Sequence, residues 1–241
     1  MIQWWYTGYK LVNRKFMGNL EIETSLSEHA YQRLRHEILT CILQPGQVVS
    51  ERELAKKFQV SKTPIREALA QTCYDGLMQR LPGRGYMVSQ ITVKDIRDLF
   101  DLRLILELAA AERAALNPPP NLLARLKDMA NVSYALEDPE SHVMFLKTNR
   151  DFHVTLAEAA ANRRLSDQLG DLLNDMDRLF YLGLRLRDSS EEMVREHQEV
   201  VDALQNRDVE KVKRVIIQQI NTSRDRILEA IMHGNIDNIH V

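Results

Sequence analysis

Apolar residues in the front part of the chain recur at helical spacing between polar stretches. Leu34, Ile38 and Ile42 lie four apart within residues 31–43, which predicts a helix carrying all three on one face. A Pro-Gly pair then turns the chain. Residues 51–58 have the mixed charged and apolar pattern of a short amphipathic helix. The pattern therefore predicts two helices joined by a turn.

A third helix is predicted to begin at Ser61. Serine is a good helix-capping residue, and Pro64 falls in the first turn, where its missing N–H costs little. Lys62, Thr63 and Arg66 then project from the N-terminal end of this helix, the end that helix-turn-helix proteins insert into the DNA major groove. The stretch by itself fits an ordinary capped surface helix equally well, so both interpretations stay open at this point.

Residues 79–88 contain two short extended runs around a glycine-rich, cationic tip, which predicts a β-hairpin. Three helices followed by a basic hairpin form a winged helix-turn-helix. This arrangement favours DNA binding over the surface-helix interpretation.

From residue 91 onward the pattern is helical throughout. Thr92 and Asp95 form a capping-box sequence at the start of a helix that runs to about residue 116, where a run of three prolines breaks it. Further helices are expected at about 121–136, 138–161, 163–186, 190–205 and 208–232. The predicted fold class is mainly α, with an N-terminal winged helix-turn-helix (three helices plus a β-hairpin wing) and an all-α antiparallel bundle of six to seven helices.

The charge of the chain follows this division into parts. The expected parts are an N-terminal extension (residues 1–24), the winged helix-turn-helix (25–90) and the helical domain (91–241). Residues 25–90 carry nine cations and six acids, a net charge of +3, whereas the whole chain has −2. A basic head on an acidic body suits one face that meets phosphate. Because +3 is a modest charge, we expect two heads to act together on DNA.

The motifs of the head resemble those of GntR-type repressors. The similarity covers residues 26–90 and includes Ser50-Glu51-Arg52-Glu53-Leu54-Ala55, Val60 through Leu69 and Pro82-Gly83-Arg84-Gly85. The resemblance implies DNA contacts by Arg52, Ser61, Lys62, Thr63, Arg66, Gly83 and Arg84. Two positions depart from the family pattern. Lys62 replaces a more frequent arginine, so a two-pronged grip becomes a point charge, and Thr72 replaces a leucine, which predicts looser packing.

The helical domain resembles the FCD effector domain that accompanies this head in the FadR-like branch. In that family, a carboxylate or amide four residues before a histidine, together with two later histidines, holds a divalent metal. Asn149, His153 and His197 match three of these positions, but Gln219 stands where the third histidine belongs. The resemblance also implies that an arginine, here Arg103, receives the carboxylate of an effector.

Three interpretations of these residues remain open. A divalent metal (Zn, Ni or Mn) on Asn149, His153 and His197 would be held less tightly than in the family, because two better donors are missing. Alternatively, Arg103, Asn149, His153, His197 and Gln219 bind the effector directly, with Arg103 as the carboxylate clamp. Finally, these polar residues could simply satisfy one another in the core.

The predicted function is a ligand-responsive transcriptional regulator of the repressor type. We expect a homodimer bound to an inverted-repeat operator, with DNA affinity controlled by a small organic acid in the bundle. No catalytic residues are expected, since no nucleophile or carboxylate pair is suitably spaced. The alternatives are a DNA-binding protein whose bundle only dimerises and a helical-bundle metalloenzyme that uses His153 and His197.

Other residues give weaker expectations. No apolar run approaches the roughly 20 residues that span a bilayer, and Cys41 and Cys73 have no metal-ligand spacing, so we expect a cytoplasmic protein with reduced thiols. The aromatic first residues lack the apolar core of a signal peptide; either Met17 is the natural start or this arm packs on the body or a partner subunit. We expect four methionines to fill gaps in the core, namely Met129, Met144, Met176 and Met193. We expect His142, His233 and His240 to lie on the surface, and Arg178, Arg185 and Arg187 to form a solvated helix face.

Overall fold

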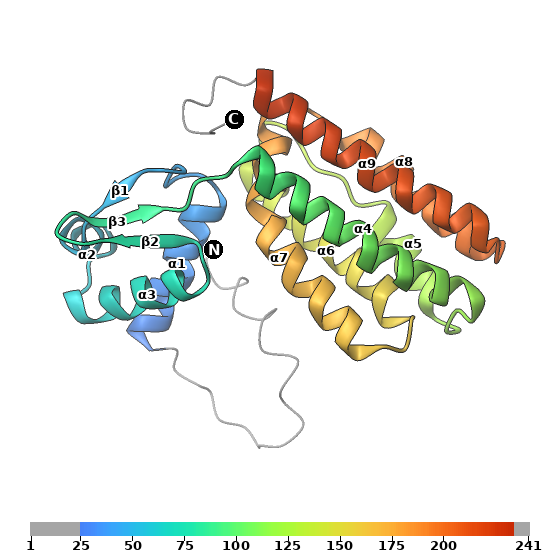
Figure 1. Ribbon diagram of the computed structural model, residues 1–241, viewed down its shortest axis with the longest axis horizontal. Helices are drawn as coiled ribbons and strands as arrows, with labels where there is room; N and C mark the ends of the chain where they lie inside the picture. The colour runs from blue at the N-terminus through green and yellow to red at the C-terminus, as the bar shows by residue number, and fades with distance from the viewer. Residues whose placement is uncertain (1–24, 234–241) are drawn as a thin grey trace, which may run out of the picture.

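The computed structural model describes residues 25–233, and Figure 1 shows the head on one side of the helical bundle. The N-terminal extension, including Met17, and His240 lie outside the described residues, as does the side chain of His233. The head consists of α1 (Leu26–Leu39), β1 (Val48–Val49), α2 (Glu51–Phe58), α3 (Lys62–Tyr74), β2 (Met78–Leu81) and β3 (Gly85–Val88). Its three strands form an antiparallel sheet in the order β1-β3-β2. The predicted winged helix-turn-helix is confirmed.

The core of the head lies between α1, α3 and the sheet. Leu34 and Ile38 are fully buried there, but Ile42 is 56% exposed, so the third member of the predicted stripe was wrong. The helix ends at Leu39, and Cys41 then adopts a left-handed φ of 53°, which turns the chain and buries Leu43 instead.

Thr72, which replaces the family's leucine, lies on the buried side of the recognition helix. Its side chain is fully buried, and its hydroxyl donates a hydrogen bond of 3.0 Å to the carbonyl of Leu69. The threonine therefore satisfies its own polar group within the helix.

The wing is a tight hairpin that requires glycine at its tip. Gly83 has a φ of 72°, and the N–H of Arg84 donates to the carbonyl of Leu81 at 3.0 Å, which closes the turn. A Cβ atom on Gly85 would lie 2.5 Å from the carbonyl oxygen of Val49, so only glycine lets β3 approach β1 here. The turn thus holds Arg84 at the exposed end of the hairpin.

The bundle consists of α4 (Val93–Leu116), α5 (Leu122–Ala130), α6 (Pro139–Glu158), α7 (Arg163–Leu186), α8 (Ser190–Gln205) and α9 (Val209–His233). The six predicted helices are confirmed, and the capping box of Thr92 and Asp95 at the start of α4 forms as expected. Only α5 is much shorter than predicted. Its chain leaves the helix so that Tyr134 packs inward and accepts a hydrogen bond of 2.8 Å from the backbone of Ser189.

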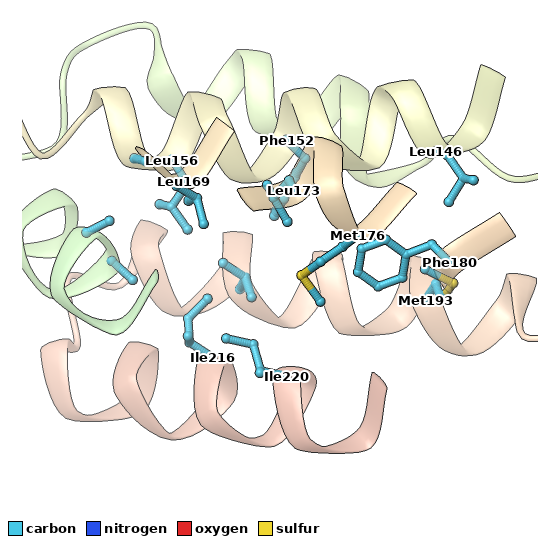
Figure 2. Packing of buried hydrophobic residues seen from close by; sticks show 14 of the residues in the cluster. Leu146, Phe152, Leu156, Leu169, Leu173, Met176, Phe180, Met193, Ile216 and Ile220 are labelled. Atoms are coloured by element: carbon cyan, nitrogen blue, oxygen red, sulfur yellow. The ribbon is translucent and has the colours of Figure 1, made fainter. Parts of the chain in front are cut away.

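Figure 2 shows apolar side chains from several helices meeting in the interior of the bundle. In this view Leu169 and Leu173 of α7 lie across the core from Ile216 and Ile220 of α9, and the ring of Phe180 points toward Met176. Met176 and Met193 are buried as predicted, and Met129 packs against the same core, but Met144 is 59% exposed and fills no gap. Burial of this core supplies the main stabilisation of the bundle.

Ser89, in the link between β3 and α4, joins the head to the bundle. Its N–H and hydroxyl donate to the carbonyls of Leu77 and Gly76, while its own carbonyl accepts a hydrogen bond of 2.7 Å from Arg178 of α7. Arg178 is therefore buried rather than solvated, and that expectation was wrong. Cys41 of the head also packs against the core of the bundle.

Candidate nucleic-acid interface and effector site

The seven residues predicted to contact DNA are all exposed, namely Arg52, Ser61, Lys62, Thr63, Arg66, Gly83 and Arg84. They come from the start of α2, the start of α3 and the tip of the wing. Ser61 is the N-cap of α3, but its side chain makes no capping hydrogen bond, so the predicted cap was wrong. The first turn of α3 carries no acidic residue. It therefore offers backbone N–H groups and cations to an anion.

Glu51 connects the recognition helix to the wing. Its carboxylate accepts a hydrogen bond of 2.7 Å from Nε of Arg66, and its other oxygen lies 3.4 Å from the hydroxyl of Tyr86 in β3. The Arg66 side chain nevertheless remains 63% exposed. The hydrogen bond to Glu51 raises the pKa of Arg66, which stays a cation. Sequence reasoning missed Glu51 and Tyr86, because three separate elements bring these side chains together.

The polar residues singled out in the bundle are all buried in its interior. Each is at most 5% exposed: Arg103 and Glu107 on α4, Asn149 and His153 on α6, His197 on α8 and Gln219 on α9. We call this set the polar cluster. The structure thus places the five predicted effector-binding residues in the core together with Glu107, which the sequence analysis did not select. Glu107 could have been noticed because it lies one turn after Arg103 on the same helix face.

Arg103 is held from several sides. Its Nε donates to Oε1 of Glu107 at 2.5 Å, and its Nη2 lies 3.0 Å from Nε2 of His153. Nδ1 of His153 lies 2.7 Å from Oε2 of Glu107, although this contact lacks the direction of a good hydrogen bond. The guanidinium also lies 5.4 Å and 5.9 Å from the ring centroids of Phe180 and Phe100. The charge of Arg103 is thus balanced inside the protein.

The pKa values of the cluster follow from this balance. Burial alone raises the pKa of Glu107, but the neighbouring Arg103, and then His153, lower it to about 2. Burial lowers the pKa of His153, and Arg103 lowers it further against the opposing effect of Glu107. Burial, His153 and Arg103 together hold the pKa of His197 well below its usual range. Both histidines are therefore neutral at physiological pH.

Some atoms of the cluster keep unused hydrogen-bonding capacity. Among residues 25–233, both ring nitrogens of His197 and Oε1 of Gln219 are buried without a hydrogen-bond partner. A buried polar atom without a partner is costly, so such atoms mark a place where a ligand or water would be stabilised. The described part of the chain contains no group of three or more His, Cys, Asp or Glu side chains placed to hold a metal ion. Two imidazoles and two neutral amides are a poorer donor set for a transition metal than the site that the family resemblance implies.

A small pocket lies one helical turn from these unpaired atoms. It has an empty volume of about 300 Å³, part of it open to solvent, and is lined by Phe180, Gly183, Leu184, Arg187, Ser189, Met193, Ser223, Arg226 and Ile227. Met193 precedes His197 by four residues on α8, and Ser223 follows Gln219 by four residues on α9, so each pair shares a helix face. The lining of the pocket thus shares helix faces with His197 and Gln219 but includes neither residue.

Two arginines at this pocket are already paired with acids. Arg226 makes a two-pronged contact with Glu196 at 2.6 and 2.9 Å, and Arg187 contacts Glu192 at 2.8 Å. Arg187 thus lines the pocket, while Arg185 is exposed as expected. The sequence analysis had no signal for the pairing of Arg226, which joins α9 to α8.

His142 is buried, contrary to the expectation of a surface residue. It is 2% exposed, and its ring lies 5.0 Å from that of Tyr134 and 6.1 Å from that of Tyr181. Neither ring nitrogen has a well-directed hydrogen bond among the described residues.

Cys41 and Cys73 are both free and partly buried.

Comparison with known proteins gives the family. Residues 26–88 match the bacterial regulatory proteins of the gntR family, and residues 98–222 match the FCD domain. The chain belongs to the GntR family. Its FCD domain alone covers more than half of the sequence.

The relatives of this GntR-family chain are transcriptional regulators. It is 28% identical over 207 residues to the transcriptional repressor RspR of Escherichia coli K12, which covers 83% of this chain and 91% of that protein. It is 27% identical over 213 residues to the gluconate operon transcriptional repressor of Bacillus subtilis, covering 87% of this chain and 81% of that repressor. The expectation of a regulator rather than an enzyme is therefore confirmed.

Solved structures support the fold of this GntR-family chain. The Escherichia coli regulator McbR/YncC superposes with a TM-score of 0.66 at 20% identity, and a GntR regulator from Rhodococcus sp. RHA1 gives 0.67 at 23%. Each match covers 86% of this chain and 99% of the other. At such identity the likeness concerns the fold alone.

Within residues 25–233, no helix is long and apolar enough to cross a membrane.

Proposed function

We propose that this GntR-family regulator binds an inverted-repeat operator as a dimer and that a small organic acid in the bundle controls its DNA affinity. The observation that carries the DNA-binding part is the exposed cationic end of α3 beside the basic tip of the wing. Lys62, Thr63 and Arg66 read base edges or adjacent phosphates, while Arg52 and Arg84 mainly hold phosphates and minor-groove edges.

Two exposed apolar side chains on α4 support a dimer through the bundle. Leu102 is 46% exposed and Ile105 is 66% exposed, and α4 packs against α9, where Ile217 is 36% exposed. A twofold axis on this surface would pair the two heads and match a dyad in the operator. Ile105→Glu should give a monomer in sedimentation, whereas Met144→Glu, an exposed apolar position on α6, should remain dimeric.

The effector part of the proposal is supported by the polar cluster and the neighbouring pocket. A ligand carboxylate entering there would compete with Glu107 for the guanidinium of Arg103, and His197 and Gln219 would hydrogen-bond its remaining polar atoms. The names of curated relatives include a gluconate operon repressor, which agrees with an acid as the ligand.

Helix α7 is a physical route between this site and the head. Phe180 of α7 lies against Arg103, while Arg178, half a turn away, donates to the carbonyl of Ser89 in the link to the head. An effector that moves α7 would therefore change the position of the head. The resulting change in DNA affinity is limited by the difference between the effector's affinities for the two head positions.

The first test is DNA binding by Arg66→Ala. The operator is obtained by repeated selection of duplexes from a random library with the wild-type protein. Arg66→Ala should weaken binding to the selected duplex by about 1–3 kcal/mol. Arg163→Ala, which removes an exposed cation on the bundle, is the matched control and should bind like the wild type. Equal binding by Arg66→Ala and the control would contradict the assignment of the recognition helix.

The second test separates effector response from DNA binding. Arg103→Met combined with Glu107→Leu removes the charged pair together, so no buried charge is left without its partner. This double variant should bind the selected duplex normally but lose its release by organic acids that act on the wild type. Retained release would contradict the role of Arg103.

A further inference from the structure

The structure fixes the hydrogen positions on His153. Nε2 of this ring lies 3.0 Å from Nη2 of Arg103. A guanidinium group has only N–H donors, so Nε2 must be the acceptor and its lone pair is directed at Arg103. The ring hydrogen is then on Nδ1, beside Oε2 of Glu107 at 2.7 Å. The geometry alone therefore identifies one neutral tautomer of His153.

A metal ion on His153 would need the same lone pair. Zinc bound by a histidine lies about 2.0–2.1 Å from the ring nitrogen, along the direction that Nη2 of Arg103 occupies here. The two cations would also repel each other in a buried site, where water screens poorly. Glu107, Phe100 and Phe180 hold the guanidinium in this place. A metal could enter only if Arg103 left.

The donors that remain after His153 are weak. They are the imidazole of His197 and the side-chain amides of Asn149 and Gln219, all neutral. One imidazole and two amides form a poor set for a transition metal, which prefers several imidazole, thiolate or carboxylate ligands. The carboxylate of Glu107, which lies in the same cluster, is engaged by Arg103.

We propose that the polar cluster binds its effector without a metal ion and that the guanidinium of Arg103 occupies the position and supplies the positive charge of that ion. The proposal deepens the proposed function and rests on it where it refers to an effector. The effector then meets a charge already balanced by Glu107, and its polar atoms are recognised by the unpaired atoms of His197 and Gln219.

Zinc binding tests the proposal without knowledge of the effector. Full-length wild type, Gln219→His and the triple variant Arg103→Met/Glu107→Leu/Gln219→His are prepared without chelator, analysed for metal, and titrated with zinc. Gln219→His supplies the third histidine but leaves Arg103 on His153. The triple variant also frees the lone pair of His153, and it removes both members of the charged pair so that neither is left alone.

The proposal predicts no stoichiometric metal in the wild type or in Gln219→His. The triple variant should bind one zinc ion per chain, about 10- to 100-fold more tightly than Gln219→His. One bound metal per wild-type chain would overturn the proposal, and so would equally tight zinc binding by Gln219→His and the triple variant. A folded triple variant that binds no zinc would also overturn it, because Arg103 would then not be what excludes the metal.

The wild type and Gln219→His decide the question even if the triple variant does not fold, since both keep the charged pair. Circular dichroism checks the folding of each protein. Zinc content does not depend on operator binding or on release by acids. Zinc binding by the wild type would therefore contradict this proposal without affecting the tests of the proposed function. Failed tests of operator binding or release would likewise leave the conclusion from zinc binding unchanged.

Discussion

In the head, the cations predicted to bind DNA stand in solvent, whereas in the bundle the charged residues are buried and neutralise one another. Arg66 illustrates the first case, with a side chain that is 63% exposed despite its contact with Glu51. Arg103 illustrates the second, since its side chain is 2% exposed and bonded to Glu107. The cations of the head can therefore exchange their partners for phosphate, whereas a change to the buried charges of the bundle costs free energy of folding.

The largest expected effect comes from breaking the buried pair. Glu107→Gln leaves the charge of Arg103 without its partner and should lower the free energy of unfolding by about 3–5 kcal/mol, measured by denaturant titration. Asp98→Asn, which breaks the exposed pair with Lys94, should cost at most about 1 kcal/mol. Similar losses in both variants would remove the distinction between buried and exposed pairs.

The stability that this pair contributes also depends on pH, because Glu107 titrates. Its pKa in the folded protein, about 2, is below the ordinary value of 4.5, so its stabilisation is present above about pH 4.5 and is lost as the pH falls toward 2. The wild type should therefore lose stability over this range, and Glu107→Gln should lose less. Parallel pH profiles for the two proteins would contradict the low pKa.

Asp177 of α7 should give the opposite pH dependence. Burial raises its pKa to about 6, although Arg150, at 2.8 Å, and Arg35 of the head lower it. Between pH 3.8 and about pH 6, Asp177 is therefore protonated in the folded state but ionised in the unfolded state. The contribution of Asp177 to the free energy of unfolding should fall by at most about 3 kcal/mol as the pH rises through this range.

Asp177→Asn should remove that fall. Relative to the wild type, the variant should become more stable between pH 4.5 and pH 7, a range that avoids the titration of Glu107. Urea titrations at the two pH values measure the effect, with the exposed Asp98→Asn as a control. The buried histidines titrate in both proteins, so a stability difference between the wild type and Asp177→Asn that is the same at both pH values would show that Asp177 is already ionised at pH 4.5.

The smallest effect on stability is expected at Glu51 in the head. Glu51→Gln weakens an exposed ion pair and should cost about 0.2–1 kcal/mol of stability. The same change removes a negative charge beside Arg66, so binding to the selected duplex should strengthen unless Glu51 is needed to orient Arg66 toward the DNA. Anisotropy titrations distinguish these roles, and a loss of binding would identify Glu51 as a positioning residue.

The sequence predicted local features far better than contacts between elements. The bounds of α4 and α7 could be predicted because caps and breakers act within a few residues, as the capping box of Thr92 does. The exposed residues of α3 were predictable for the same reason, since helical spacing alone puts them at its N-terminal end. The failed cap at Ser61 marks the limit of that reasoning.

The interior of the bundle was less predictable because its geometry depends on several helices at once. Spacing along α6 placed Asn149 and His153 on one face, but it could not reveal that Arg103 binds the lone pair of His153. His142 was assigned to the surface because it has no partner at a suggestive spacing, and Arg178 because it was grouped with Arg185 and Arg187 on a solvated helix face. Packing of the α5–α6 connection buries His142, and the link to the head buries Arg178.

The most direct test of the central claim is hydrogen–deuterium exchange of the full-length protein with and without the selected duplex. DNA should slow exchange in peptides covering residues 61–66 at the start of α3 and 82–85 at the tip of the wing. Peptides from the middle of α6 and α8, which carry His153 and His197, should change little in comparison. Protection confined to the bundle, with unchanged exchange at the start of α3, would contradict the claim that the exposed cationic tip is the DNA-binding surface.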